Sequence, residues 1–183
     1  QASFLLHLLI GGRVVCLPSG SVQSVRLQAK QAGYSTDDVL VNVRTAAGVE
    51  HRLLAQIKHH AAIRTSDGEF CDALGNAWAD FNNQTAFAQG RDALALITGP
   101  QSDQTLQHVR PLLDWARTSA SSAEFVGKVA TATFSSDKKR AYLQIFREVL
   151  TKAAGITPPD DILWQFLKHL HLLSFDFDVV QGS

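Results

Sequence analysis

The stretch DDVLVNVRTAAGVEHRLLAQIK, residues 37–58, decides the fold. Within it, Val39–Val43 is apolar and mostly β-branched, which indicates a strand. Thr45–Val49 contains a glycine and predicts a turn, and Arg52–Lys58 predicts a second strand. Strands joined by so short a connection pair in antiparallel fashion, so the stretch predicts a β-hairpin.

The residues after the hairpin predict a helix and then a further strand. Asp67 is placed to cap the helix, whose apolar residues recur at helical spacing: Phe70, Leu74, Ala77, Trp78 and Phe81. Ala93–Thr98 is a continuous apolar run closed by Gly99-Pro100, which is typical of a buried strand. The order strand, helix, strand favours a right-handed parallel crossover, and therefore a mixed sheet.

The flanking segments complete the predicted fold. Upstream of the hairpin we expect a helix over Gln1–Ile10 that stops at Gly11-Gly12, and strands over Arg13–Leu17 and Val22–Ala29. Beyond Pro100 the sequence is helical in pattern, with predicted helices at Asp103–Thr118, Ala123–Ala132, Ser136–Ala154 and Asp160–Leu173. The prediction is an α/β fold with an αβ core over residues 1–100 and a mainly helical extension over 101–183.

Composition excludes several classes of protein. With 45% hydrophobic and 19% charged residues in a chain of 183, the protein has an ordinary globular composition. The formal net charge is zero, so any nucleic-acid site must be a local basic patch. Cys16 and Cys71 lie in no zinc-binding or disulfide spacing. Apolar runs such as Phe4–Ile10 are too short to span a bilayer, and we expect no membrane contact and a cytoplasmic protein.

The hairpin also carries a set of residues suited to phosphodiester chemistry. Asp38 begins the first strand, and Gln56 and Lys58 lie two apart on the returning strand. Because side chains alternate along a strand, Gln56 and Lys58 share one face while Ile57 points to the other. A turn centred near Ala47-Gly48 places Asp38 opposite Ile57, within one position of both. Carboxylate and amide oxygens are the ligands that Mg²⁺ or Mn²⁺ prefers, and a lysine beside them offsets phosphate charge.

This arrangement resembles the core of the PD-(D/E)XK nuclease superfamily in a variant with glutamine at the second acidic position. The resemblance implies that Asp38 and Gln56 bind the metal and that Lys58 orients the attacking water or neutralises charge on the phosphate. It also implies a restriction-endonuclease-like core, a mixed sheet flanked by helices. Nucleases of this core often carry an acidic residue further upstream, but residues 1–36 contain no Asp or Glu and Gln28 stands in that place. We therefore expect one-metal chemistry.

Most of the chain is similar to a narrower group, the double-stranded-DNA endonuclease domains at the N-terminus of bacterial antiphage proteins. These domains occur fused to nucleotide-sensing modules or to STAND-type NTPases. The resemblance implies activity against double-stranded DNA, activation through homo-oligomerisation of the full-length protein, and a downstream sensor or ATPase module, of which this chain is the nuclease piece. The stretches that carry it are Thr36–Val41, Ala55–His60, Phe70, Trp78–Phe81, Phe87, Arg91–Gly99, Glu124–Phe125, Ser136–Arg140 and Leu163–Asp176.

Several residues keep two interpretations at this level. Asp37 could replace Asp38 as the ligand, although the ligand is expected to lead directly into the strand. His59, His60 and Arg64 could contact phosphates of DNA or could simply begin a loop. The run Lys138–Arg140 could follow a DNA backbone or form a solvated helix face. For the whole chain, the alternative to an enzyme is a catalytically silent module of the same fold that binds DNA or mediates assembly.

Overall fold

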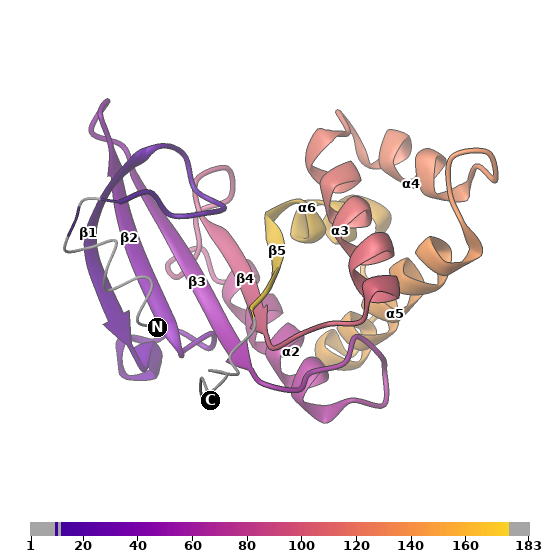
Figure 1. The fold of residues 1–183 in the computed structure, drawn as a ribbon, viewed down its shortest axis with the longest axis horizontal. Helices are drawn as coiled ribbons and strands as arrows, with labels where there is room; N and C mark the ends of the chain where they lie inside the picture. The colour runs from indigo at the N-terminus through magenta and orange to yellow at the C-terminus, as the bar shows by residue number, and fades with distance from the viewer. Residues whose placement is uncertain (1–9, 11, 176–183) are drawn as a thin grey trace, which may run out of the picture.

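A computed structural model gives the structure of residues 10 and 12–175 (Figure 1). Its five-stranded sheet has the strand order β1-β2-β3-β4-β5. The strands are β1 (Gly20–Leu27), β2 (Val39–Thr45), β3 (Glu50–Lys58), β4 (Ala93–Thr98) and β5 (Leu170–Ser174). The helices are η1 (Ala29–Ala32), α2 (Gly68–Asn82), α3 (Asp103–Thr118), α4 (Ser122–Ala130), α5 (Asp137–Ala154) and α6 (Asp160–His169).

The predicted hairpin and the mixed sheet are confirmed. β2 pairs with β3 in antiparallel fashion, and Gly48 in the connecting turn has the positive φ of 79° that favours glycine. β3 then pairs with β4 in parallel, through the crossover that contains α2. Asp67 caps α2 as expected, because its carboxylate accepts a hydrogen bond of 2.9 Å from the N–H of Phe70.

Two predicted elements are wrong. Residues 13–17 form no strand: the N–H of Leu17 bonds the carbonyl of Val14, and Cys16 has a φ of 79°, so the chain turns there. The helix predicted over Asp160–Leu173 ends at His169, and β5 follows as a strand parallel to β4. As a strand this apolar segment pairs with the second edge of β4 and satisfies the backbone groups of that edge, which a continued helix would leave without partners. The helix expected over Gln1–Ile10 lies almost wholly outside the described residues.

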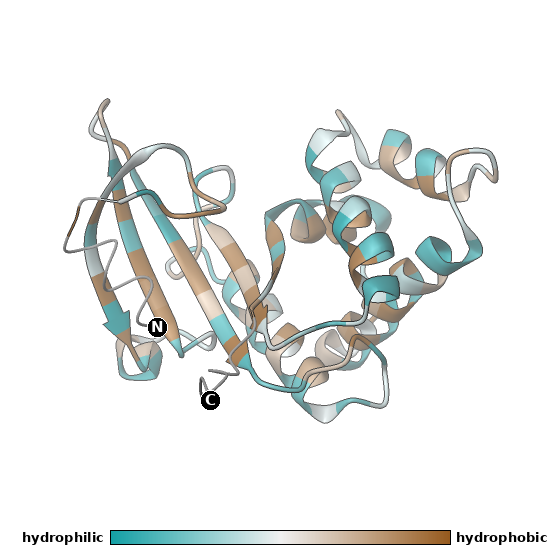
Figure 2. Cartoon of the chain, in the orientation of Figure 1, coloured by the Kyte–Doolittle hydropathy of each residue, from teal (hydrophilic) through white to brown (hydrophobic). Residues whose placement is uncertain are grey.

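The central strands β2, β3 and β4 are rich in hydrophobic residues (Figure 2), and their side chains belong to core clusters on both faces of the sheet. One face joins the helices in a single core that includes Leu40, Leu54 and Leu94. The opposite face forms a second cluster that includes Val39, Leu53 and Ala95. Burial on both faces explains why these strands are continuous apolar runs rather than alternating ones.

The helices cover only part of the sheet. α2 packs on β3, β4 and α5, and α3 packs on β5, α5 and α6, whereas β1 and β2 lie at the far end of the sheet (Figure 1). Asp38, which directly precedes β2, is partly exposed, whereas Val39 and Leu40 at the start of the strand are buried. Among the helices of the described residues, none is long and apolar enough to cross a membrane.

A buried carboxylate fastens the segment that leads into β2. Asp80, on α2, is 1% exposed and accepts hydrogen bonds from the backbone N–H of Ser35 at 2.8 Å and of Thr36 at 2.6 Å. This contact joins residues more than forty positions apart and fixes where the chain enters Asp38.

Replacing Asp80 by alanine is expected to lower the free energy of unfolding by about 2–4 kcal/mol, since the buried N–H of Thr36 and the partly buried N–H of Ser35 lose a shared acceptor. Urea denaturation followed by circular dichroism measures the loss. The control is Asp72→Ala, at an exposed position of the same helix, with an expected change within about 0.5 kcal/mol. Equal effects of the two substitutions would contradict the role given to Asp80.

Burial also sets the protonation of His171, a residue of β5. Burial, with a smaller contribution from the positive charge of Arg117, lowers the pKa of His171 from 6.5 to about 4, and Asp114 opposes the shift. The folded protein therefore holds a neutral imidazole over a range of pH in which the unfolded chain is protonated. The stabilisation from this residue is full above pH 6.5 and is lost as the pH falls toward 4.

Between pH 7 and pH 5 the wild-type protein is expected to lose about 2 kcal/mol of stability through this histidine. The variant His171→Gln, which cannot take up a proton, should lose that much less over the same interval. Urea unfolding at the two pH values measures the difference, with His60→Gln as the control at an exposed position. An unchanged pH dependence in His171→Gln would contradict the prediction.

Candidate functional site

Asp38 and Gln56 are brought into direct contact by the hairpin. One oxygen of the Asp38 carboxylate, Oδ2, accepts a hydrogen bond of 2.5 Å from Nε2 of Gln56 and one of 2.7 Å from the N–H of Ile57. Asp38 thus holds the end of β3 as well as a side chain on it. Asp37 has no such contact with β3, so of the two aspartates it is Asp38 that meets Gln56.

The register of the hairpin differs by one residue from the sequence prediction. Val39 pairs with Ala55, so the next step of the ladder places Asp38 opposite Gln56 rather than opposite Ile57. The turn centres on Ala47, because the N–H of Thr45 bonds the carbonyl of Val49. The corrected register puts the two side chains on the same face of the sheet, which is the reason that they can bond.

Gln56 presents an oxygen that has no partner. The side chain is buried, at 5% exposure, and its Oε1 atom makes no hydrogen bond. A buried polar atom without a partner destabilises a fold by about 1–3 kcal/mol. The hydrogen bond to Asp38 fixes the amide so that Nε2 faces the carboxylate and Oε1 faces elsewhere. An oxygen held in this way is suited to a hard cation.

Lys58 lies on the same face of β3 as Gln56, two residues further on, at a spacing of roughly 7 Å along the strand. It is half-buried, and no ion pair found within the described residues involves it. Its neighbour in register on β4 is Thr98, which is fully buried and whose Oγ1 atom also lacks a partner. The apolar face of β2–β4 therefore becomes polar at this edge of the sheet.

The loop after β3 presents the predicted phosphate-contacting residues at the surface. His59, His60 and Arg64 are all exposed. The loop is held from beneath, because Asp67 accepts from the N–H of Ala62 at 3.1 Å and Gln101 donates to the carbonyl of Ala61 at 2.8 Å. Its backbone is thus fixed next to Lys58 while these side chains face solvent.

Gln28 lies on the other side of Asp38. Its N–H bonds the carbonyl of Asp38 at 3.3 Å, which continues the ladder between β1 and β2. Gln28 has left-handed backbone angles, φ 53° and ψ 58°, a conformation that costs a residue other than glycine about 1 kcal/mol. It borders an open hollow of about 380 Å³, whose lining is Gln28, Lys30, Gln31, Asp37 and Asp38. The sequence alone gave no sign of this hollow.

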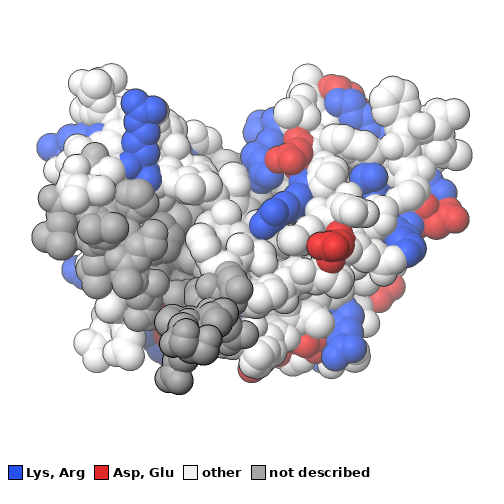
Figure 3. Space-filling model, in the orientation of Figure 1, with Lys and Arg blue, Asp and Glu red and all other residues white. Residues whose placement is uncertain are grey.

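The basic run at the start of α5 is partly engaged within the helical part. Arg140 pairs with Asp137, and the ammonium of Lys139 lies 5.3 Å from the centre of the Trp115 ring. Only Lys138 of the three is fully exposed without such a contact. Figure 3 shows basic and acidic side chains interspersed over the helices of the face in view. This favours a solvated helix face for the run.

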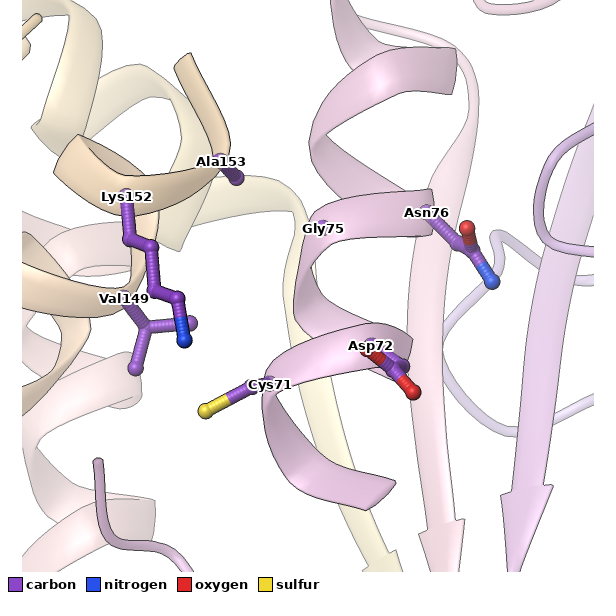
Figure 4. Close-up of a pocket in the computed structure, with 7 residues that line it drawn as sticks. All are labelled: Cys71, Asp72, Gly75, Asn76, Val149, Lys152 and Ala153. Carbon is purple, nitrogen blue, oxygen red and sulfur yellow. The ribbon is translucent and has the colours of Figure 1, made fainter. Parts of the chain in front are cut away.

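A second hollow, of about 480 Å³, lies between α2 and α5 (Figure 4). In this view Cys71 points toward Lys152 and Val149, whereas Asp72 and Asn76 point to the opposite side of α2. Burial raises the pKa of the Cys71 thiol, so it is not an activated nucleophile. The polar groups here do not converge as those at Asp38 do.

The donor set at Asp38 is one carboxylate and one amide oxygen. In keeping with this, the described residues contain no group of three or more His, Cys, Asp or Glu side chains arranged to hold a metal ion. A cation at this site would therefore rely on the Gln56 oxygen, on backbone carbonyls and on water.

Comparison with protein families, with curated proteins and with solved structures finds no significant match for this chain. The fold is established from the chain's own residues as α/β, with a mixed five-stranded sheet and a C-terminal part that is mostly helical.

Proposed function

We propose that this chain is a metal-dependent DNA endonuclease. The observation that carries the proposal is the pair formed by Asp38 and Gln56, in which a buried amide oxygen is left without a partner beside a carboxylate and next to Lys58. A buried polar atom without a partner lowers the stability of a fold, so a ligand that completes the bonding of this oxygen would be favoured here. A mixed sheet flanked by helices further supports a restriction-endonuclease-like core.

The residues present fit Mg²⁺ or Mn²⁺. Oδ1 of Asp38 would hold the ion, and Oε1 of Gln56 would join it once the side-chain amide turns over, because Nε2 is the atom that faces the carboxylate in this structure. When bound, such an ion polarises a phosphoryl oxygen and lowers the pKa of water. With a single carboxylate the site favours one ion over two.

The other side chains supply charge and position. Lys58, which no acidic side chain of the described residues pairs with, would orient the attacking water or offset the charge that develops on the phosphate. The N–H of Ile57 keeps the Asp38 carboxylate fixed, so that this group needs no rearrangement when substrate arrives. His59, His60 and Arg64 would contact phosphates beyond the cut bond.

The resemblance to antiphage effector domains extends the proposal to its biological setting. The substrate would be double-stranded DNA, and cleavage would be switched on when the full-length protein forms a homo-oligomer through a downstream sensor or ATPase module. The alternative is a catalytically silent module of the same fold, favoured by the absence of Asp and Glu from residues 1–36.

Lys58→Ala is expected to lower plasmid cleavage in the presence of Mg²⁺ or Mn²⁺ by about 100-fold or more, because it removes the positive charge two residues beyond Gln56 on the same face of β3. Agarose-gel assays of plasmid conversion measure the rate. The control is Lys152→Ala, which removes an exposed lysine from the hollow in Figure 4 and should cut like wild type. Full activity of Lys58→Ala would refute this assignment, and a wild-type protein that never cuts, even when assembled, would favour the silent module.

Metal binding offers a test that does not depend on cleavage. Gln56→Glu adds a charged ligand and is expected to raise the affinity for Mn²⁺ by about tenfold, whereas Gln56→Leu should weaken it. Electron paramagnetic resonance of free Mn²⁺ during titration measures both. Without metal, Gln56→Glu should also melt at a lower temperature than wild type, since two carboxylates then meet, and added Mn²⁺ should restore it.

Gln84→Glu is the matched control for this titration, because it makes the same change at an exposed position in the loop after α2. It should bind Mn²⁺ as wild type does. If all three variants titrate identically, Gln56 is not a metal ligand.

A further inference from the structure

Three residues lie in one row across neighbouring strands at the site. The β1–β2 ladder ends at the pair Leu27 and Val39, and the β2–β3 ladder has Val39 opposite Ala55. One step further on, Gln28, Asp38 and Gln56 stand side by side. Adjacent strands lie about 4.8 Å apart, so Gln28 is as near to Asp38 on one side as Gln56 is on the other.

Gln28 departs from strand geometry at this point. Within the described residues only Cys16 and Gln28 have a positive φ without being glycine. The conformation of Gln28 is enforced on both sides, because its own N–H bonds Asp38 and the next N–H, of Ala29, bonds the carbonyl of Asp37 at 2.6 Å. Ala29 is completely buried and anchors the turn. The chain is thereby bent so that Gln28 and Lys30 border the hollow beside Asp38.

The hollow is lined by one ammonium, that of Lys30, and by the carboxylates of Asp37 and Asp38, so it suits an anion when a cation bound at Asp38 offsets the acidic charge. Lys30 and Gln31 are exposed, and no ion pair found in the described part of the chain involves Lys30. An ammonium at this place disfavours a second metal ion, but it complements a phosphate. The Gln28 amide adds a neutral hydrogen-bond donor.

We infer that the hollow bordered by Gln28 and Lys30 binds a backbone phosphate of the strand that is cut, next to the scissile phosphate. An enzyme that cuts inside a strand must hold backbone on both sides of the scissile bond. Lys58, His59 and His60 occupy one side of Asp38, and Lys30 with Gln28 occupies the other. This inference rests on the proposed nuclease function and assigns Gln28 to the substrate rather than to a metal.

A binding measurement tests the subsite apart from catalysis. In a Lys58→Ala background, Lys30→Gln is expected to weaken binding of a fluorescent 20-base-pair duplex by roughly five- to tenfold at 100 mM salt, and to lower the slope of log affinity against log salt by about one. Lys138→Gln makes the same charge change on α5 and should leave both quantities unaltered.

Equal affinities and slopes for Lys30→Gln and Lys138→Gln overturn the subsite, and so does a parent protein that binds no duplex at low salt. The proposed nuclease function fails on a different result, which is a wild-type protein that does not cut plasmid with Mg²⁺ or Mn²⁺ even when it is assembled.

A second variant separates binding from folding. Gln28→Gly relieves the left-handed backbone, so its melting temperature should equal or exceed that of wild type, while its affinity for the duplex falls. A purely structural role for Gln28 would instead lower the melting temperature or leave DNA affinity unchanged, and either outcome overturns the inference.

Discussion

β3 is the strand on which the rest of the structure depends. It pairs with β2 on one side and with β4 on the other, and its residues Leu53 and Leu54 are fully buried on opposite faces of the sheet. Each core cluster therefore contains part of this one strand. Its last residues carry Gln56 and Lys58, so the site is rigid because the strand beneath it cannot move without disrupting both cores.

The hairpin and its chemistry could be predicted because both depend on local patterns. Alternation along a strand placed Gln56 and Lys58 on one face, and the short connection brought Asp38 back to them. The register was missed by one residue, since it depends on where the turn between Thr45 and Val49 centres. β5 was missed because Leu170–Leu173 is a short apolar run that suits a helix or a strand equally. Leu170–Leu173 forms a strand because the open edge of β4 is available to pair with it.

Other features of the site depend on contacts that no local pattern reveals. The bend at Gln28 results from its hydrogen bonds to the start of β2, and nothing in the letters around it predicts a left-handed glutamine. The same is true of Thr98, which ends an apolar run in the sequence and lies beside Lys58 in the sheet. The role of Asp80 in holding Ser35 and Thr36 is equally a matter of tertiary structure. The sequence therefore predicts the central residues Asp38, Gln56 and Lys58, whereas the surrounding residues Gln28, Thr98 and Asp80 are identified only from the structure.

The position of β5 has a consequence for how the chain folds as it is synthesised. Residues 20–58 contain β1, β2 and β3, which can pair with one another as soon as they emerge. β4 follows, but its second edge has to wait for β5, which comes only after α3, α4, α5 and α6. Until then an apolar strand has an open side on which another chain could pair. During synthesis the helices between β4 and β5 thus act as a long loop whose closure completes the sheet. A chain that ends before residue 170 would leave the edge of β4 open and would be prone to aggregate.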